Sequence, residues 1–229
     1  MKDLTVIYYT ANRLKENFAE NVRKQLKTTI GKLPLISLSK KPMDFGLNIC
    51  EGNTESSVIN IYKALLMGAK AAKTKYVALA EDDTLYPPHH FFEYLPPEDT
   101  FAFNFSRWNF FTWSRPPCFS LRSRRILATL IAPRQLLIQD LEERFASYPD
   151  ASKIPLSLMV EPGRDLEQRL GVAPKKAIDF YSNIPVVVFS HPEALGFQGL
   201  GKRKATGKIK AIEIPYWGRA EDVLKLYEG

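Results

Sequence analysis

Residues Lys75 to Pro88 read Lys-Tyr-Val-Ala-Leu-Ala-Glu-Asp-Asp-Thr-Leu-Tyr-Pro-Pro. The stretch begins with mostly apolar residues that suit a β-strand, Lys75 to Ala80, and three consecutive carboxylates follow at Glu81, Asp82 and Asp83. An apolar run of this length predicts a strand that is covered on both faces. In open α/β sheets, ligands bind just beyond the carboxyl ends of such strands. We therefore expect a buried strand whose acidic end lies at the ligand-binding edge of a sheet.

The acidic triplet can be interpreted in two ways, as a solvated turn or as a metal site. Adjacent carboxylates raise one another's pKa and repel unless a cation lies among them. Mg²⁺ and Mn²⁺ suit oxygen ligands and are usually held by one or two protein carboxylates together with phosphate oxygens of a substrate. If the extended backbone continues, Glu81 and Asp83 point one way and Asp82 the other.

A predicted helix in front of the strand favours the metal site. From Ser57 to Lys73, apolar residues recur at the spacing of a helix with one buried face, namely Val58, Ile61, Tyr62, Leu65, Leu66, Ala69 and Ala72. Ser56 or Ser57 can cap its first turn. A helix that leads into a buried strand with an acidic end resembles the metal-binding region of GT-A glycosyltransferases. In those enzymes an Asp-x-Asp type motif holds Mn²⁺ or Mg²⁺ against the diphosphate of a nucleotide sugar.

The resemblance implies an α/β fold of the GT-A type, a Rossmann-like fold that binds nucleotide sugars. Its central sheet is mostly parallel, with helices on both faces and an antiparallel addition on the acceptor side. Residues 1–99 would form the nucleotide-sugar half and residues 100–229 the acceptor half of one domain. The motif would place metal ligands at Glu81 and Asp83, with Asp82 beside the bound nucleotide sugar, and a UDP-sugar is the expected donor.

Composition agrees with one globular domain. The chain has 229 residues, of which 45% are hydrophobic and 25% charged. Its N-terminus lacks the length and cleavage site of a signal peptide, and no apolar stretch approaches the ~18 residues that span a bilayer. Cys50 and Cys118 lie too far apart in sequence to suggest a disulfide framework, so we expect a cytoplasmic protein, in the host cytoplasm if it is viral. The formal charge of +7 favours anionic partners such as nucleotide diphosphates, nucleic acid or a membrane surface.

The first part of the chain predicts a βα unit followed by another strand. Leu4 to Tyr9 form an apolar strand, and the helix after the turn buries Phe18, Val22 and Leu26. By resemblance the turn contacts the nucleotide base and ribose, through Thr10, Asn12 and Arg13. Asn12 could equally cap the helix. Pro34 to Ser39 predict a second strand, and the turn-rich segment Lys40 to Thr54 is long for a connection, which suggests a lid or a wall of the nucleotide site.

The character of the chain changes after the acidic triplet. Thr100 to Ser106 alternate phenylalanines with small or polar residues, which predicts a strand with one aromatic face. Ile126 to Ile131 predict a further strand. Pro133 would start a helix with Leu137, Leu141 and Phe145 buried and with Asp140, Glu142 and Glu143 exposed.

Aromatic and arginine residues are interleaved just after the phenylalanine-rich strand. Most of these aromatics are expected to pack in the core of an addition to the sheet edge. Rings and guanidinium groups in this pattern also bind bases, phosphates or sugars. The candidates for acceptor binding are Arg107, Trp108 and Trp113.

Val160 to Gly171 contain the candidate general base. The segment is similar to the Glu-Asp region of family-two glycosyltransferases, where an acidic residue at the start of a helix removes a proton from the acceptor hydroxyl. Arg164 stands where that pattern has Glu, so the base could be Asp165 or Glu161. Asp165 could instead only cap a short helix that Gly171 closes.

The C-terminal part predicts a phosphate site. Ile184 to Phe189 form a strand that ends at Ser190-His191-Pro192, and a glycine-rich basic loop follows it. By resemblance His191 completes the metal shell and Lys202 contacts the diphosphate, and the glycines would let Arg203 approach it as well. Ile209 to Pro215 and a helix from Ala220 to Tyr227 are expected to pack back on the domain.

These features predict a metal-dependent glycosyltransferase of the hexosyltransferase type. The chain also resembles compact phage-type glycosyltransferases, some of which modify hydroxymethylated pyrimidines in DNA, and its net charge and arginines suit a DNA acceptor. A saccharide or lipid-linked acceptor is the alternative, and a non-catalytic nucleic-acid-binding domain is a third. A sugar nucleotidyltransferase would need a glycine-rich loop after the first strand, and Thr10-Ala11-Asn12-Arg13 is not one.

Overall fold

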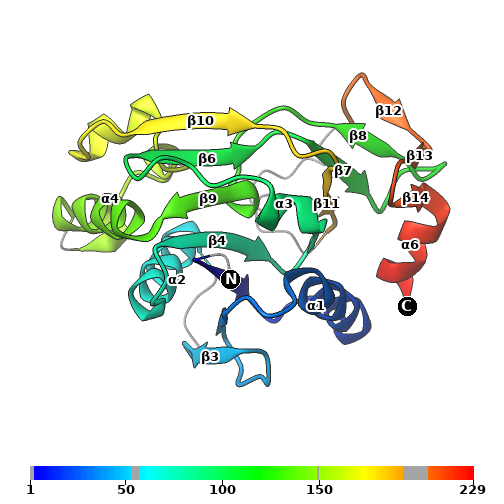
Figure 1. The fold of residues 1–229 in the computed structure, drawn as a ribbon, viewed down its shortest axis with the longest axis horizontal. Helices are drawn as coiled ribbons and strands as arrows, with labels where there is room; N and C mark the ends of the chain where they lie inside the picture. The colour runs from blue at the N-terminus through cyan, green and yellow to red at the C-terminus, as the bar shows by residue number, and fades with distance from the viewer. Residues whose placement is uncertain (1–2, 53–56, 149, 193–205) are drawn as a thin grey trace.

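A sheet of seven strands forms the centre of the molecule (Figure 1). The computed structural model describes residues 3–52, 57–148, 150–192 and 206–229. Along the sheet the strands follow the order β10 (Lys176–Phe180), β6 (Thr100–Asn104), β9 (Leu130–Pro133), β4 (Tyr76–Glu81), β1 (Leu4–Thr10), β2 (Leu35–Ser39) and β3 (Leu47–Cys50). Only β9 runs antiparallel to its neighbours, β4 and β6. The predicted mostly parallel α/β sheet is confirmed.

Helices cover both faces of this sheet. On one face α2 (Val58–Ala71) and α4 (Arg134–Ala146) pack against side chains such as Val77 and Leu79 of β4. On the other face α1 (Glu16–Ile30) packs near Ala78 and Ala80, the alternate residues of the same strand. The short helix α3 (Pro88–Phe92) lies on this second face as well. β4 is therefore buried on both sides, as its unbroken apolar sequence predicts.

A second sheet of five strands is the addition predicted from the aromatic residues. Its order is β12 (Lys210–Ala211), β8 (Phe119–Leu121), β7 (Arg107–Phe111), β11 (Val186–Ser190) and β5 (Thr84–Leu85). Its pairs are antiparallel except for β7 with β11. One face carries Phe110, Phe119 and Phe189, which pack on α1 and on the C-terminal helix α6 (Ala220–Glu228). The hairpin of β13 (Glu213–Ile214) and β14 (Gly218–Arg219) precedes α6, so the C-terminal segment packs back on the domain as expected.

Two predicted segments differ from the structure. Residues 40–52, expected as a connection, contain the edge strand β3, because its backbone pairs in parallel with β2. The strand expected at Ile126 to Ile131 begins only at Leu130, since Leu127–Thr129 form the 3-10 helix η1 and the Thr129 N–H donates to the Ile126 carbonyl. Further 3-10 helices are η2 (Ala151–Lys153), η3 (Leu156–Leu158) and η4 (Asp165–Leu170).

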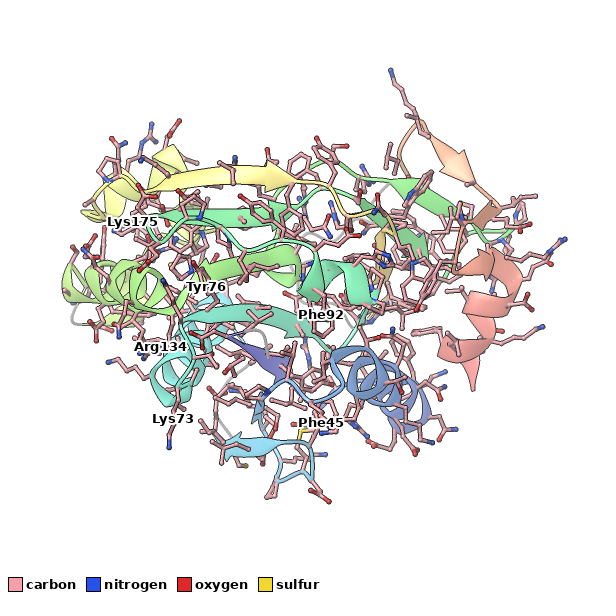
Figure 2. The ribbon with its side chains drawn as sticks, in the orientation of Figure 1. Phe45, Lys73, Tyr76, Phe92, Arg134 and Lys175 are labelled. Atoms are coloured by element: carbon pink, nitrogen blue, oxygen red, sulfur yellow. The ribbon has the colours of Figure 1, made fainter. Side chains whose placement is uncertain are left out.

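A buried charge network corrects the prediction that Asp140 is exposed. The Arg144 side chain, itself fully buried, donates from Nε to Asp140 Oδ2 at 2.9 Å and also pairs with Glu167. Lys175 Nζ lies 3.9 Å from Asp140 Oδ1, and Figure 2 shows Lys175 next to α4. Burial raises the pKa of Asp140, and the neighbouring Arg144 opposes this shift. Asp140 is buried because residues 156–171 cover this part of α4, which helical periodicity alone does not reveal, whereas Glu142 is exposed as predicted.

Replacing Arg144 with alanine should strongly destabilise the protein. The substitution leaves Asp140 and Glu167 as buried carboxylates without their main partner, and breaking a buried ion pair in this way costs about 3–5 kcal/mol. The free energy of unfolding, measured by urea denaturation, tests this. Arg169 on η4 is exposed, so Arg169→Ala is the matched control and should change stability by less than about 0.5 kcal/mol. Equal stabilities of the two variants would contradict a structural role for the network.

Candidate functional site

A cavity of about 350 Å³ lies where the two sheets meet, beyond the carboxyl ends of β1, β4 and β11. Many of the residues predicted from the sequence line it. From the first half of the chain these are Arg13, Glu81, Asp82 and Asp83, and from the second half Arg107, Glu161 and His191. The tertiary fold therefore brings the predicted metal candidates together with at least one nucleotide, one acceptor and one base candidate.

All three carboxylates of the acidic triplet face this cavity. The alternation expected for a continuing strand does not apply to Asp82, because the chain leaves the extended conformation after Glu81 and turns at residues 82–83 into β5. The Glu81 N–H donates to Tyr86 Oη at 3.1 Å, and Tyr86 Oη donates to the Ala128 carbonyl at 2.9 Å. This buried tyrosine fixes the turn against η1.

The closest contact among the predicted metal ligands joins Asp83 and His191. Asp83 Oδ2 lies 3.2 Å from His191 Nε2, although the two residues are 108 positions apart in sequence. The pairing of β5 with β11 brings them together, with Thr84 opposite Val188 and the Phe189 N–H donating to the Asp83 carbonyl at 2.8 Å. The imidazole is buried, whereas 14% of the Asp83 side chain is exposed toward the cavity.

The Asp82 carboxylate is more strongly desolvated than a carboxylate in water. Thr10 Oγ1 donates to Asp82 Oδ2 at 2.6 Å. Burial raises the pKa of Asp82 to about 7, and the negative charge of Asp83 adds to the shift, while Thr10, His191 and Arg13 oppose it. A cation at this end of the cavity would stabilise the ionised carboxylate.

The first turn of the chain is organised by Asn12. Its φ of 51° is left-handed, and its Oδ1 accepts the N–H groups of Lys40 at 2.8 Å and Lys41 at 3.0 Å. Its own N–H donates to Thr10 Oγ1 at 2.9 Å, so Asn12 links the end of β1, the Asp82 contact and the end of β2. The alternative that Asn12 caps the helix is wrong, since α1 begins at Glu16. Contacts of Thr10, Asn12 and Arg13 with a nucleotide stay a prediction.

The donor set fits a divalent ion held by few protein ligands. A carboxylate and an imidazole at 3.2 Å from one another can share one cation, and Mn²⁺ or Mg²⁺ sites of this kind are completed by substrate phosphate oxygens and water. Within the described ranges, no group of three His, Cys, Asp or Glu side chains could hold a metal by itself. The protein ligands we expect are therefore Asp83 and His191, with Glu81 on the cavity wall. Lys202 and Arg203 lie outside the described residues.

Of the two candidate bases, only Glu161 lines the cavity that contains Asp83 and His191. Glu161 lines the same cavity, and Arg164 Nη1 lies 3.5 Å from its Oε2. Asp165 lines a separate hollow together with Arg124, Arg125 and Arg164.

Glu167 and not Asp165 caps the short helix. Helix η4 begins at Asp165, and the Glu167 carboxylate accepts the N–H groups of Gly163 at 2.7 Å and Arg164 at 3.1 Å. The same Glu167 pairs with Arg144, whose Nη1 donates to the Val160 carbonyl at 2.7 Å. Gly171 closes the helix with a φ of 79°, as predicted. This network fixes the backbone immediately before Glu161.

The acceptor candidates divide between the two faces of β7. Arg107 lines the cavity, and so does Asn109, which the sequence pattern did not single out. Trp108 points to the other face, where it packs on the core shared with α1 and α6. Trp113 packs edge-to-face on Phe111, with ring centroids 5.3 Å apart. The structure does not bring either tryptophan to the cavity, so their part in acceptor binding stays a prediction. The period-two alternation of a strand could have indicated Asn109 beside Arg107.

Solved structures with a similar arrangement include viral and bacterial glycosyltransferases. A glycosyltransferase involved in glycosylation of the major capsid of PBCV-1 is 10% identical, with 81% of this chain and 91% of that chain covered and a TM-score of 0.49. For S. aureus TarS 1-349 the identity is 12%, the covered shares are 83% and 61%, and the TM-score is 0.41. The inositol-1-phosphate CTP transferase from T. maritima is 13% identical, with 82% and 89% covered and a TM-score of 0.48.

No protein family model and no curated protein matches the chain. At the identities and TM-scores of the structural matches, the similarity concerns the arrangement of strands and helices and not the reaction. The chemistry of the site rests on the residues of this chain.

The raised pKa of Asp82 predicts a specific pH dependence of stability in chelator. The folded pKa of about 7 lies above the usual 3.8, so the fold favours the protonated carboxyl. This contribution is fully present below about pH 4 and is lost as the pH rises through 7. Asp82→Asn cannot ionise and keeps an oxygen that accepts from Thr10. As the pH rises from about 5 to about 8, we expect the stability of this variant to increase by about 2–3 kcal/mol relative to that of wild type.

Urea unfolding at the two pH values measures this difference. The exposed Asp44→Asn is the matched control for loss of one carboxylate. If the free energies of unfolding of wild type and Asp82→Asn differ by the same amount at both pH values, the proposed environment of Asp82 is contradicted.

Proposed function

We propose that this protein is a metal-dependent glycosyltransferase that moves a hexosyl group from a nucleotide-diphosphate sugar to an acceptor hydroxyl. The observation that carries the proposal is the Asp83–His191 contact of 3.2 Å at the strand ends, in one cavity with Arg13, Asp82 and Glu161. The ligand-binding edge of an α/β sheet is where a nucleotide is expected. The acidic side chains favour a cation there, and the cation in turn attracts a diphosphate.

Each residue of the site has a proposed role. Asp83 and His191 hold the ion, Mn²⁺ or Mg²⁺, and Glu81 supports it. Asp82, fixed by Thr10, faces the donor, while Asn12 and Arg13 contact its base and ribose. When bound, the divalent ion stabilises the negative charge that grows on the departing diphosphate. Lys202 and Arg203 would act on the same charge. A UDP-sugar as donor follows from the resemblance to GT-A enzymes.

Glu161 is the proposed general base. It lies in the cavity that holds the metal pair, whereas Asp165 lies in the neighbouring hollow. A base has to come within hydrogen-bond reach of the proton that it removes, and this geometry favours Glu161. Residues 1–99 would supply most of the donor site and residues 100–229 most of the acceptor site, with the cavity between them.

For the acceptor we propose a hydroxymethylated pyrimidine in DNA. The net charge of +7 and the arginines near the cavity support an acceptor that carries phosphates. A saccharide or lipid-linked acceptor is the alternative. The described part of the chain contains no helix long and apolar enough to cross a membrane. Cys50 and Cys118 are both free thiols, which supports the proposal of a reducing, cytoplasmic location.

Removing either proposed metal ligand should greatly slow the reaction and leave the fold intact. We expect Asp83→Ala and His191→Ala each to lower turnover by about 10²-fold or more, because the charge on the leaving group is no longer stabilised. UDP-glucose hydrolysis with Mn²⁺, and transfer to DNA containing hydroxymethylcytosine, measure this. Asp222→Ala on α6, an exposed carboxylate, is the control.

Three outcomes of this assay would be decisive. Full activity of Asp83→Ala, or of wild type in excess chelator, would exclude the metal role. Transfer to saccharide but not to DNA would replace the proposed acceptor. Nucleic-acid binding without any turnover of the nucleotide sugar would favour a non-catalytic domain.

If Glu161 is the base, neutralising Glu161 should lower kcat more than neutralising Asp165. Glu161→Gln should lower kcat by about 10²–10⁴-fold without weakening UDP binding, since general base catalysis contributes about this much. Asp165→Asn should lower kcat less. Steady-state kinetics and UDP titration of both variants measure the effects, and the opposite order of losses would assign the base to Asp165.

A further inference from the structure

Arg107 carries a buried guanidinium group with an unused edge. The residue is only 2% exposed and lines the cavity. Nη1 donates to Asn109 Oδ1 at 2.7 Å, but Nε and Nη2 have no hydrogen-bond partner among the described residues. These two nitrogens form the side of the guanidinium that binds a carboxylate or phosphate with two parallel hydrogen bonds.

Such an arrangement is unfavourable in the free protein. A buried charged donor without a partner loses hydration that nothing replaces, which is why buried arginines are normally paired. Burial lowers the pKa of Arg107 to about 10, and the positive charges of Arg124 and Arg122 add to the shift. Glu81 and Glu161 oppose it, but no ion pair within 4.0 Å joins either of them to Arg107 in the described structure. An anion supplied by a ligand would remove this cost.

The place of Arg107 separates it from the metal pair. Arg107 and Asn109 lie on the cavity face of β7, and Asn109 Nδ2 donates to Ser190 Oγ on β11 at 2.9 Å. Because Arg107 pairs with Val186 and Phe111 with Ser190, the backbone of Arg107 lies four residues from the level of Ser190 and five from that of His191. Five residues of strand span about 17 Å between backbones. The Arg107 side chain reaches back to Asn109, so one side chain separates its guanidinium from Ser190. A diphosphate held at Asp83 and His191 would therefore lie at one end of this polar ladder and the free guanidinium edge at the other.

We propose that Arg107 binds a carboxylate or phosphate group of the acceptor, so that the acceptor of this protein is an anionic molecule whose negative group docks at the far end of the cavity. The inference rests on the proposed glycosyl transfer and specifies its acceptor. Glu161, the proposed base for the acceptor hydroxyl, lines the same cavity as Arg107, and this supports an anionic group on the acceptor.

A second positively charged side chain, Arg124, lies next to this subsite. Arg124 is exposed and lines both the cavity and the neighbouring hollow, which also contains Arg125 and Arg164. An anionic acceptor would be attracted along these arginines before its negative group reaches Arg107. Arg125 is already paired with Asp179 through Nε at 2.7 Å, so Arg124 and Arg107 are the cations expected to contribute most.

The test uses the full chain and two anions as probes. UDP and Mn²⁺ are first titrated by calorimetry, and inorganic phosphate or glucuronate is then titrated with and without them at constant ionic strength. We expect at least one anion to bind the wild type, and Arg107→Met to weaken its binding at least 10-fold while UDP affinity stays within about 2-fold. Tighter binding of phosphate assigns a phosphate-bearing acceptor, and tighter binding of glucuronate a carboxylate-bearing one. Arg219→Gln, an exposed arginine on β14, is the charge-matched control.

If Arg107→Met does not fold, a second variant can be used in its place. Arg107→Lys keeps the charge but loses the two-nitrogen edge, and it should weaken anion binding several-fold. The subsite is overturned if neither anion binds the wild type. It is also overturned if the anions bind a folded Arg107 variant as tightly as they bind the wild type. UDP binding without anion binding rejects the subsite alone. Anion binding without UDP binding rejects the glycosyltransferase proposal and, with it, the assignment to an acceptor.

Discussion

The pairing of β5 with β11 is the constraint on which the site depends. β5 has only two residues, Thr84 and Leu85, and it follows directly after the acidic triplet. Its antiparallel ladder with β11, extended by the hydrogen bond from the Phe189 N–H to the Asp83 carbonyl, joins the two sheets at the end of β4. Without this short ladder, Asp83 and His191 would belong to different parts of the molecule, and no two-ligand metal site would form.

Charge is distributed unevenly along the cavity that this ladder closes. Asp82 and Asp83 lie at one end, where burial keeps the Asp82 pKa near 7. Arg107 lies at the other end with an unpaired guanidinium edge. Each end is electrostatically unfavourable in the free protein, and each would be relieved by a ligand of opposite charge. A cation with a diphosphate at the acidic end and an anionic acceptor at the basic end satisfy both.

Buried ion pairs away from the cavity give the site its rigidity. Arg144 connects α4 to Glu167 and to the Val160 carbonyl, and Glu167 in turn binds the N–H groups of Gly163 and Arg164. The backbone on both sides of Glu161 is therefore tied to the core. A candidate base on a segment of turns and 3-10 helices needs this kind of support, because catalytic geometry tolerates little displacement.

Local periodicity in the sequence is sufficient to predict the main strands and helices. The apolar run before Glu81, the helical stripe through Tyr62 and Leu65, and the alternation around Phe101 and Phe103 each predicted the element that forms, because burial of one or both faces selects residues at a fixed spacing. The acidic strand end and His191 could also be recognised from the sequence as site candidates. Packing seldom explains charged or titratable groups that come directly after buried strands.

How distant groups combine in the site depends on the three-dimensional fold. The burial of Asp140 depends on residues 156–171 folding over α4, and the choice of Glu161 over Asp165 for the cavity depends on where that segment turns. The contact between Asp83 and His191 depends on strand pairing across 108 positions, and the unpaired edge of Arg107 depends on which side chains the second sheet places around it. These are long-range contacts, and a chain's local pattern carries no record of which of its surfaces will meet.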